Sequence, residues 1–226
     1  MIVVIAGMYR SGSTFSFNVA RELLLRRGSL HQSTGPDIYE ALSNSNTDHI
    51  LLRAHELDAT SIRLCQVGGA RVICTTRHPT DAVASLIEVF EWSEEEAVER
   101  IRQWLHLYQE IKGVALTVNY SEIDRRPIGA VRQMGKYLVG RVGVGEILDI
   151  ARRYSKANVK VTTDRLERSS PGVQDIGFSW YDNNTYFHRR HISSLRTRSA
   201  EQRLPQEQVR RIEAALLRDA KELTTK

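Results

Sequence analysis

Short apolar runs alternate with stretches of helical periodicity along this chain. Residues 2–6, IVVIA, form an uninterrupted run of mostly β-branched side chains, a composition typical of a strand buried on both faces of a parallel sheet. Comparable runs lie at residues 49–53, 70–76 and 114–118. We therefore expect four buried strands.

Between these runs, apolar residues recur at the spacing of amphipathic helices. The expected helices cover residues 14–27, 59–67, 79–90, 93–111, 125–139, 146–156 and 206–223. Polar, turn-rich composition predicts a loop over 29–47 with a short helical piece near 38–42, and a long irregular segment over 169–185. Since the chain shows neither an internal repeat nor a linker, we expect one domain spanning residues 1–226.

The loop that follows the first strand carries the strongest chemical signal. Its sequence at residues 7–14, GMYRSGST, matches the spacing of the nucleotide-binding loop G-x-x-x-x-G-K-[ST] except that Ser13 replaces the lysine, and the cation is Arg10. The residues at the expected helix entrance are Ser11, Gly12, Ser13 and Thr14. Their N–H groups lack intrahelical partners, which makes a phosphate cradle. The alternative is a purely structural strand–turn–helix joint.

Together with the alternation of strands and helices, this loop predicts an α/β fold of P-loop type, a parallel sheet flanked by helices in three layers. The serine at position 13 cannot reach forward to a γ-phosphate as a lysine does. Ordinary ATP or GTP chemistry is therefore disfavoured.

Composition narrows the class of protein. At 226 residues with 41% hydrophobic content, the chain can bury a core, and its net charge of +5 suits a polyanionic ligand. The sequence has no basic patch interleaved with aromatic residues, the pattern that would indicate a nucleic-acid-binding protein. Cys65 and Cys74 lack the pattern of a disulfide framework or a C-x-x-C motif, which favours a reducing compartment. With neither a signal peptide nor an apolar run of membrane-spanning length, we expect a soluble, cytoplasmic protein that does not bind membranes.

A second candidate phosphate site follows the third expected strand. Arg77 begins the sequence RHPTD, and Ser85 lies eight residues after it. Arg77 at a strand's carboxyl edge offers a bidentate fork to a phosphate dianion, and Ser85 adds a hydroxyl donor two helical turns on. The alternative is that Arg77 and Asp81 only cap the turn between strand and helix.

These two motifs resemble those of the PAPS-dependent sulfotransferases, which use 3′-phosphoadenosine 5′-phosphosulfate as sulfuryl donor. Residues 10–14, RSGST, resemble the family's 5′-phosphosulfate loop, and residues 77–85 resemble its 3′-phosphate motif. The resemblance covers most of the chain in element order and is specific at these two motifs. It implies that PAPS is the co-substrate, that adenosine 3′,5′-bisphosphate (PAP) is the product, and that no metal is required.

The sequence RAH at residues 53–55 resembles the family's K-x-H motif, with Arg53 in place of the lysine. The resemblance implies that His55 is the general base and that Arg53 and Arg10 stabilise charge during transfer. A neutral imidazole suits a base at physiological pH. Two alternatives stay open: His55 only bonds its own loop, or a carboxylate acts as the base, for which Glu56 is the nearest candidate.

The remaining correspondences are softer. Tyr120 resembles a tyrosine near the adenine, and Phe15 resembles the aromatic residue after the loop, although both suit core positions as well. Arg189 and Arg190 occupy the region of a family R-K-G loop that grips the 3′-phosphate, but His191 replaces the glycine. A solvated basic stretch explains these arginines equally well.

We therefore expect a sulfotransferase that moves the sulfuryl group from PAPS to a hydroxyl, less readily an amine, of a small-molecule or carbohydrate acceptor by in-line displacement. The alternatives are a P-loop kinase for a small metabolite and a non-catalytic module that binds PAP or PAPS. Nucleic acid is not an expected partner. The sequence identifies neither the acceptor nor the oligomeric state.

Overall fold

In the computed structural model, five parallel strands form a sheet in the order β2-β3-β1-β4-β5. Their bounds are β1 Ile2–Ala6, β2 Leu30–Thr34, β3 His49–Ala54, β4 Arg71–Thr76 and β5 Ala115–Asn119. The structure describes residues 1–43, 45–175, 177, 179–189, 191–192 and 195–223, with the backbone alone for 218–223. The α/β fold with a helix-flanked parallel sheet is confirmed.

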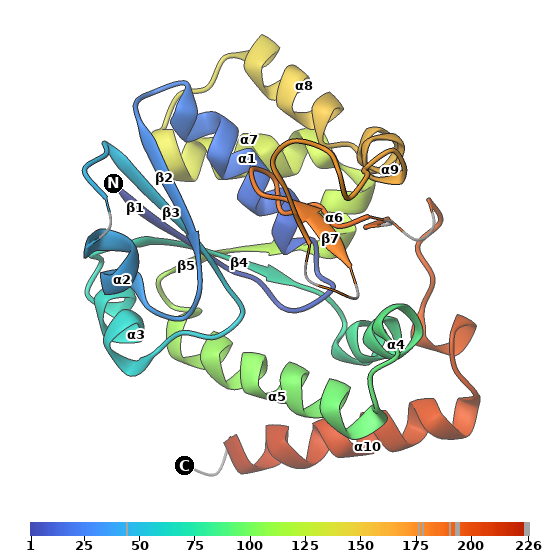
Figure 1. Cartoon of the computed structure of the whole chain (residues 1–226). Helices are drawn as coiled ribbons and strands as arrows, with labels where there is room; N and C mark the ends of the chain where they lie inside the picture. The colour runs from blue at the N-terminus through green and yellow to red at the C-terminus, as the bar shows by residue number, and fades with distance from the viewer. Residues whose placement is uncertain (44, 176, 178, 190, 193–194, 224–226) are drawn as a thin grey trace.

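Helices cover both faces of this sheet (Figure 1). On one face lie α1 Ser13–Leu25, α6 Tyr120–Arg125, α7 Pro127–Val139, α8 Val144–Arg153 and α9 Lys156–Asp164; on the other lie α2 Ile38–Ser43, α3 Ala59–Gln66, α4 Pro79–Phe90, α5 Glu94–Ile111 and α10 Gln206–Leu223. Within the described part of the chain, none of the helices is both long and apolar enough to cross a lipid bilayer.

The central strand β1 explains why both faces need cover. Successive side chains of a strand point to opposite faces, so Val3 and Ile5 join the core cluster beneath α1 and α7, which contains Phe17. Val4 and Ala6 face the other cluster, built on α4 and α5. These four side chains are fully buried, as the apolar run predicts.

The sequence misses the edge strand β2. Residues 29–47 were expected to form a loop, but Leu30–Thr34 pairs in parallel with β3 over its whole length. Its sequence, LHQST, is mostly polar because an edge strand has a single neighbour and is only partly buried. The short helix expected near residues 38–42 is confirmed as α2.

Three other boundaries differ from the expectation. A separate helix, α6, begins at Tyr120 directly after β5, where Asn119 and Glu122 form a reciprocal capping box. The helix expected over 146–156 ends at Arg153, because Ser155 starts α9 as its N-cap. The segment 169–185 contains an antiparallel pair, β6 Val173–Asp175 and β7 Trp180–Asp182, and a 3₁₀ turn, η1, covers Ala200–Gln202.

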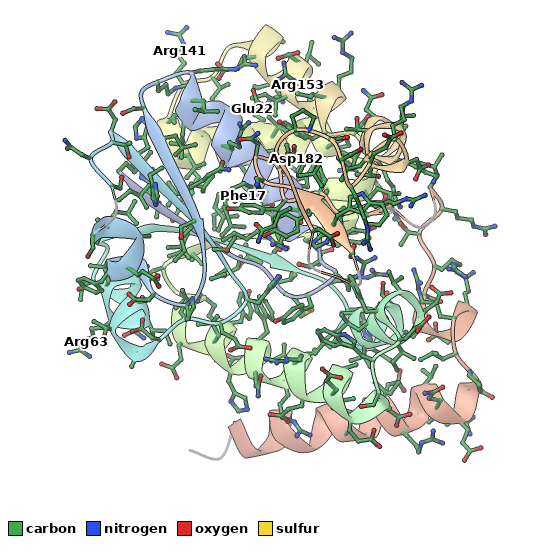
Figure 2. All side chains as sticks on the ribbon, viewed as in Figure 1. Phe17, Glu22, Arg63, Arg141, Arg153 and Asp182 are labelled. Atoms are coloured by element: carbon green, nitrogen blue, oxygen red, sulfur yellow. The ribbon has the colours of Figure 1, made fainter. Side chains whose placement is uncertain are left out.

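Helix α8 is attached to α1 through a buried carboxylate. Glu22 on α1 accepts a hydrogen bond of 2.8 Å from the Tyr154 hydroxyl just after α8, and it lies 3.3 Å from a guanidinium nitrogen of Arg153. Figure 2 shows Glu22 and Arg153 on the neighbouring helices. This network lies between α1 and the end of α8 and holds the two helices together.

Candidate active site

A cavity of about 150 Å³ lies at the carboxyl ends of β1, β3 and β4, where ligands of open α/β sheets gather. Its lining residues are Tyr9, Arg10, Gly12, Ser13, Thr14, Arg53, His55, Arg77, Ser85, Phe90, Tyr120, Lys156, His188, His191, Ile192, Arg196, Thr197 and Arg203. The two phosphate motifs and the 53–55 motif therefore converge on one cavity, although they come from three separate parts of the sequence.

The loop between β1 and α1 is shaped by close backbone approach. A Cβ on Gly7 would lie 2.3 Å from the Ser13 Cβ, and Gly12 has a φ of 86°, which favours glycine. Gly12 caps α1 without a side-chain hydrogen bond, so the N–H groups of the first turn have no intrahelical partner. Ser11 is fully buried and donates to the Met8 carbonyl at 2.6 Å. Ser11 therefore holds the loop's shape, while its neighbours face the cavity.

Arg10 extends from this loop across the cavity wall. Its backbone φ is 60°, in the left-handed region, and its Nε donates to the Ser85 hydroxyl at 3.0 Å. The guanidinium carbon lies 5.2 Å from the centre of the Phe90 ring. Burial, and then the nearby Arg77, lower the pKa of Arg10 to about 10. The Arg10 guanidinium therefore stays charged at neutral pH, and a bound anion would stabilise its charge.

Arg77 is held where the sequence predicts, at the end of β4. It is 8% exposed, and its two terminal nitrogens donate to the carbonyls of Arg10 and Arg198, each at 3.2 Å. Its Nε is buried and has no hydrogen-bond partner in the described structure. The guanidinium carbon also lies 4.7 Å from the Tyr120 ring centre. Burial lowers the pKa of Arg77, since no carboxylate pairs with it among the described residues.

His55 is fixed in one tautomer. Its Nδ1 lies 2.6 Å from the Gly7 carbonyl oxygen; because a carbonyl can only accept, Nδ1 carries the hydrogen and Nε2 is the basic nitrogen. The ring stacks on Tyr9 at a centroid distance of 3.9 Å. Burial, and then Arg53, whose Nη2 is 3.3 Å from Nε2, lower the pKa of His55 to about 3. The imidazole is therefore neutral in the free protein.

The cavity has an excess of positive charge. Lys156 pairs with Asp124, and Arg203 pairs with Glu88. In contrast, Arg10, Arg53 and Arg77 have no carboxylate partner anywhere in the described ranges, and the described lining residues include no carboxylate. Buried cations without a counter-ion are costly, so the donor set fits a polyanion. Phosphate and sulfuryl oxygens have the charge and geometry to accept these guanidinium donors.

The carboxylate alternative for the base does not lie at this site. Glu56 is exposed, pairs with Arg100 at 2.7 Å and is not among the lining residues. Asp81, on α4, accepts a hydrogen bond of 2.7 Å from the Ala200 N–H. Asp81 therefore anchors the C-terminal segment beside the cavity, which is a structural role for the acid of the RHPTD sequence.

A smaller pocket of about 70 Å³ adjoins the cavity and shares Gly12, Tyr120, Lys156, His191 and Ile192 with it. Phe15 lines this second pocket, together with apolar side chains from α6, α9 and the segment after β7. The two aromatic residues singled out from the sequence, Phe15 and Tyr120, therefore meet in one place.

The C-terminal cations differ from the expectation. Arg189 lies against the Trp180 ring at 4.9 Å and lines a separate groove, so the structure does not bring it into the cavity; Arg190 lies outside the described residues. The cations that do line the cavity are Lys156, Arg196 and Arg203, and the same wall adds His188 and His191. The basic stretch around residues 188–191 is the part of this wall that the sequence analysis singled out.

Comparisons with known proteins bear on the fold. No protein-family model matches the chain, and no curated protein matches it. Among solved structures, mouse sulfotransferase SULT7A1 complexed with PAP is similar at 14% identity with a TM-score of 0.65, covering 95% of this chain and 82% of that one. Retinol dehydratase complexed with androsterone and inactive cofactor PAP gives 9% identity and a TM-score of 0.63, covering 95% and 79%. Its complex with retinol and PAP gives 8% and 0.65, covering 95% and 80%. The chain has the sulfotransferase fold, which confirms the resemblance at that level.

Proposed function

We propose that this protein transfers a sulfuryl group from PAPS to a hydroxyl of an acceptor and releases PAP. The observation that carries the proposal is the convergence of three arginines that have no carboxylate partner among the described residues, Arg10, Arg53 and Arg77, on a glycine loop whose N–H groups at the start of α1 have no intrahelical partner. A neutral histidine, His55, lies among them, and its basic Nε2 lies 3.3 Å from Nη2 of Arg53. The fold shared with PAP-bound sulfotransferases adds support.

In this proposal, two phosphate subsites hold the donor. The first-turn N–H groups of α1, with Ser13 and Thr14, bind the 5′-phosphate. Arg77 and Ser85 bind the 3′-phosphate, and the unpartnered Nε of Arg77 is the donor that this phosphate would satisfy. The adenine lies in the apolar pocket that adjoins the cavity, against Phe15 and Tyr120.

The transfer itself needs a base and two cations. His55 Nε2 accepts the proton of the acceptor hydroxyl while that oxygen forms a bond to sulfur. The bond between sulfur and the bridging oxygen breaks, and its electron pair stays on the oxygen of the 5′-phosphate. Arg10 stabilises the charge that grows on this oxygen, and Arg53, next to His55, lies close to the sulfuryl oxygens. Positioning and charge stabilisation therefore supply most of the catalysis.

An acceptor hydroxyl must reach Nε2 of His55. The retinol dehydratase complexes contain androsterone and retinol, which supports a small-molecule acceptor here, and a carbohydrate acceptor is the second proposal. We also propose that residues 1–226 form one cytoplasmic domain.

A non-catalytic PAP-binding module is the second candidate function. The low pKa of His55, about 3, favours it, because so weak a base accepts a proton poorly until anions enter the site. A kinase is disfavoured, since a Mg²⁺ site wants carboxylate oxygens and the described lining of the cavity offers none.

Calorimetric titration with PAP, AMP and ATP in the absence of magnesium tests the proposal. We expect PAP to bind most tightly, and Arg77→Ala to weaken PAP binding by about a hundredfold, a loss within the range of a hydrogen bond between charged groups. The matched control is Arg63→Ala, which removes the same charge from an exposed position on α3 (Figure 2). A preference for ATP, or no binding of PAP, would overturn the proposed function.

A further inference from the structure

Two histidines of the C-terminal wall have no role in the mechanism above. His188 and His191 line the cavity and come from one tight turn, in which the His191 N–H donates to the His188 carbonyl at 3.0 Å. His188 forms a β-bridge with Tyr181 on β7, and its neighbour Phe187 is buried. The two imidazole rings lie parallel within 9°, with centroids 6.2 Å apart.

Both rings pack on aromatic side chains. His188 lies 5.2 Å from the Tyr181 ring centre, and the edge of His191 meets Phe187 at 5.2 Å. Within the described residues, neither imidazole forms a side-chain hydrogen bond. The two rings therefore line the same cavity as Arg10, Arg53 and Arg77, which have no carboxylate partner among the described residues, and a polyanion would supply the missing acceptors.

We propose that His188 and His191 are positioning residues of the nucleotide site that take up protons when the phosphorylated nucleotide binds. This inference rests on the proposed function. It makes the binding of PAP, and of PAPS, dependent on pH, with tighter binding at lower pH.

Electrostatics of the free cavity support this coupling. Burial, followed by Arg53 and Arg10, lowers the pKa of His188 to about 4. Burial, followed by Arg10, His188 and Arg53, lowers the pKa of His191 well below its usual value. The titratable and charged groups that share the cavity or contact these rings are Tyr9, Arg10, Arg53, His55, Arg77, Tyr120, Lys156, Tyr181, Arg196 and Arg203. His191 also lines the adjoining pocket, which adds Tyr154 and Asp124, and Asp124 is paired with Lys156. Because the one carboxylate of this described set is paired with a lysine, both imidazoles are neutral in the free protein at neutral pH.

A bound nucleotide reverses the sign of this field. Its phosphates bring several negative charges within reach of both rings and offset Arg10 and Arg53, so the pKa values of the histidines rise in the complex. A pKa that is higher in the complex than in the free protein means that binding takes up protons. The uptake is greatest between the free and the bound pKa values and vanishes above the bound ones.

Calorimetry of PAP binding in two buffers with different heats of ionisation counts these protons directly. The proteins are the wild type, His188→Gln, His191→Gln and the double variant, each at about pH 6 and about pH 8, on either side of an ordinary histidine pKa. The matched control is His106→Gln, an exposed histidine on α5. Protonation of the phosphates of PAP itself is common to all the proteins, so the difference from the wild type isolates the histidines.

We expect the double variant to take up about one proton fewer than the wild type at the lower pH and to bind PAP about tenfold more weakly there, with a difference under about twofold at the higher pH. His106→Gln should match the wild type. Equal proton uptake in the wild type and the double variant, with PAP bound tightly by both, overturns this inference alone. Failure of the wild type to bind PAP overturns the proposed function as well. Thermal unfolding shows whether each variant is folded. Because proton uptake is counted per bound nucleotide, a loss of folded protein does not by itself change the uptake.

Discussion

Arg10 donates a hydrogen bond of 3.0 Å from its Nε to the Ser85 hydroxyl, across 75 positions of the sequence. The bond joins the loop after β1 to helix α4, and so it joins the two motifs that the sequence assigns to different phosphates. Arg77 strengthens the connection, because it donates to the Arg10 carbonyl. The two proposed phosphate subsites therefore share one hydrogen-bonded wall.

Ser85→Ala tests this shared wall. Ser85 is fully buried, and a hydrogen bond to a charged group contributes about 1.5–3 kcal/mol, so we expect PAP binding to weaken by about tenfold or more. AMP lacks the 3′-phosphate and should lose less affinity. Calorimetric titration measures both ligands, with Ser43→Ala, an exposed serine on α2, as the control. Equal losses for PAP and AMP would show that Ser85 acts only through Arg10.

The protonation state of His55 can be measured in the free protein. Since its pKa is lowered to about 3 by burial and by Arg53, we expect its ring resonances not to titrate between about pH 8 and about pH 5, the range in which an ordinary histidine titrates. The shifts should correspond to the tautomer with hydrogen on Nδ1, which donates to the Gly7 carbonyl. Nuclear magnetic resonance of ring-labelled histidine, assigned with His55→Gln, measures both. A midpoint near the ordinary value would contradict the geometry.

The same variant separates catalysis from binding. If His55 is the base, His55→Gln should lower the rate of sulfuryl transfer by about a hundredfold or more, while PAP affinity changes only a few-fold, because Arg10 and Arg77 are untouched. Turnover with a panel of hydroxyl acceptors and calorimetry with PAP provide the two measurements. An unchanged rate would exclude His55 as the base; absence of turnover in the wild type over a broad panel would favour the binding module.

How much of the fold the sequence predicts depends on burial. The runs at residues 2–6 and 70–76 are apolar because β1 and β4 have neighbours on both sides and helices on both faces, so composition alone reveals them. Edge strand β2 is held by backbone pairing to β3, and its polar side chains leave no such pattern. Helix α9 was missed because its sequence, KANVKVTTD, is mostly polar or β-branched and only Val159 and Thr163 are buried, which leaves little helical pattern.

The candidate site divides in the same way. Residues near the ends of β1, β3 and β4, such as Arg10, His55 and Arg77, follow apolar runs directly, so the sequence brings them to the same edge of the sheet. Lys156, Arg203 and the histidine pair reach the cavity through long-range contacts, including the bond between Asp81 and the Ala200 N–H. The spacing of residues along the sequence does not predict such long-range contacts. The proposed roles of Arg189 and Arg190 stay predictions from the resemblance.

Tyr154→Phe tests the support behind helix α1. The Tyr154 hydroxyl donates to Glu22 at 2.8 Å in a buried position, and burial, followed by its bond to Glu22, raises the pKa of Tyr154. Losing this donor leaves a buried carboxylate with fewer partners, so we expect the free energy of unfolding to fall by about 1–3 kcal/mol. Denaturant unfolding measures it, with Tyr39→Phe, which is 46% exposed, as the control. Equal effects of the two changes would contradict a specific role for the bond to Glu22.

The pH dependence of stability follows from the three histidines of the cavity. His55, His188 and His191 all have pKa values lowered in the folded protein, whereas in the unfolded chain they return to about 6.5. Below that value the unfolded chain binds more protons, so stability is full above about pH 6.5 and falls as the pH decreases toward the folded values, by at most about 1.4 kcal/mol per pH unit for each histidine. Urea unfolding between about pH 7.5 and about pH 5 measures the slope above the range in which carboxylates titrate. His55→Gln should reduce the slope by up to about 1.4 kcal/mol per pH unit, the contribution of one proton, whereas His106→Gln should leave the slope unchanged. A free energy of unfolding that does not change over this range would contradict the lowered pKa values. Saturating PAP should reduce the slope, because the bound anion raises the pKa values of these histidines in the folded protein.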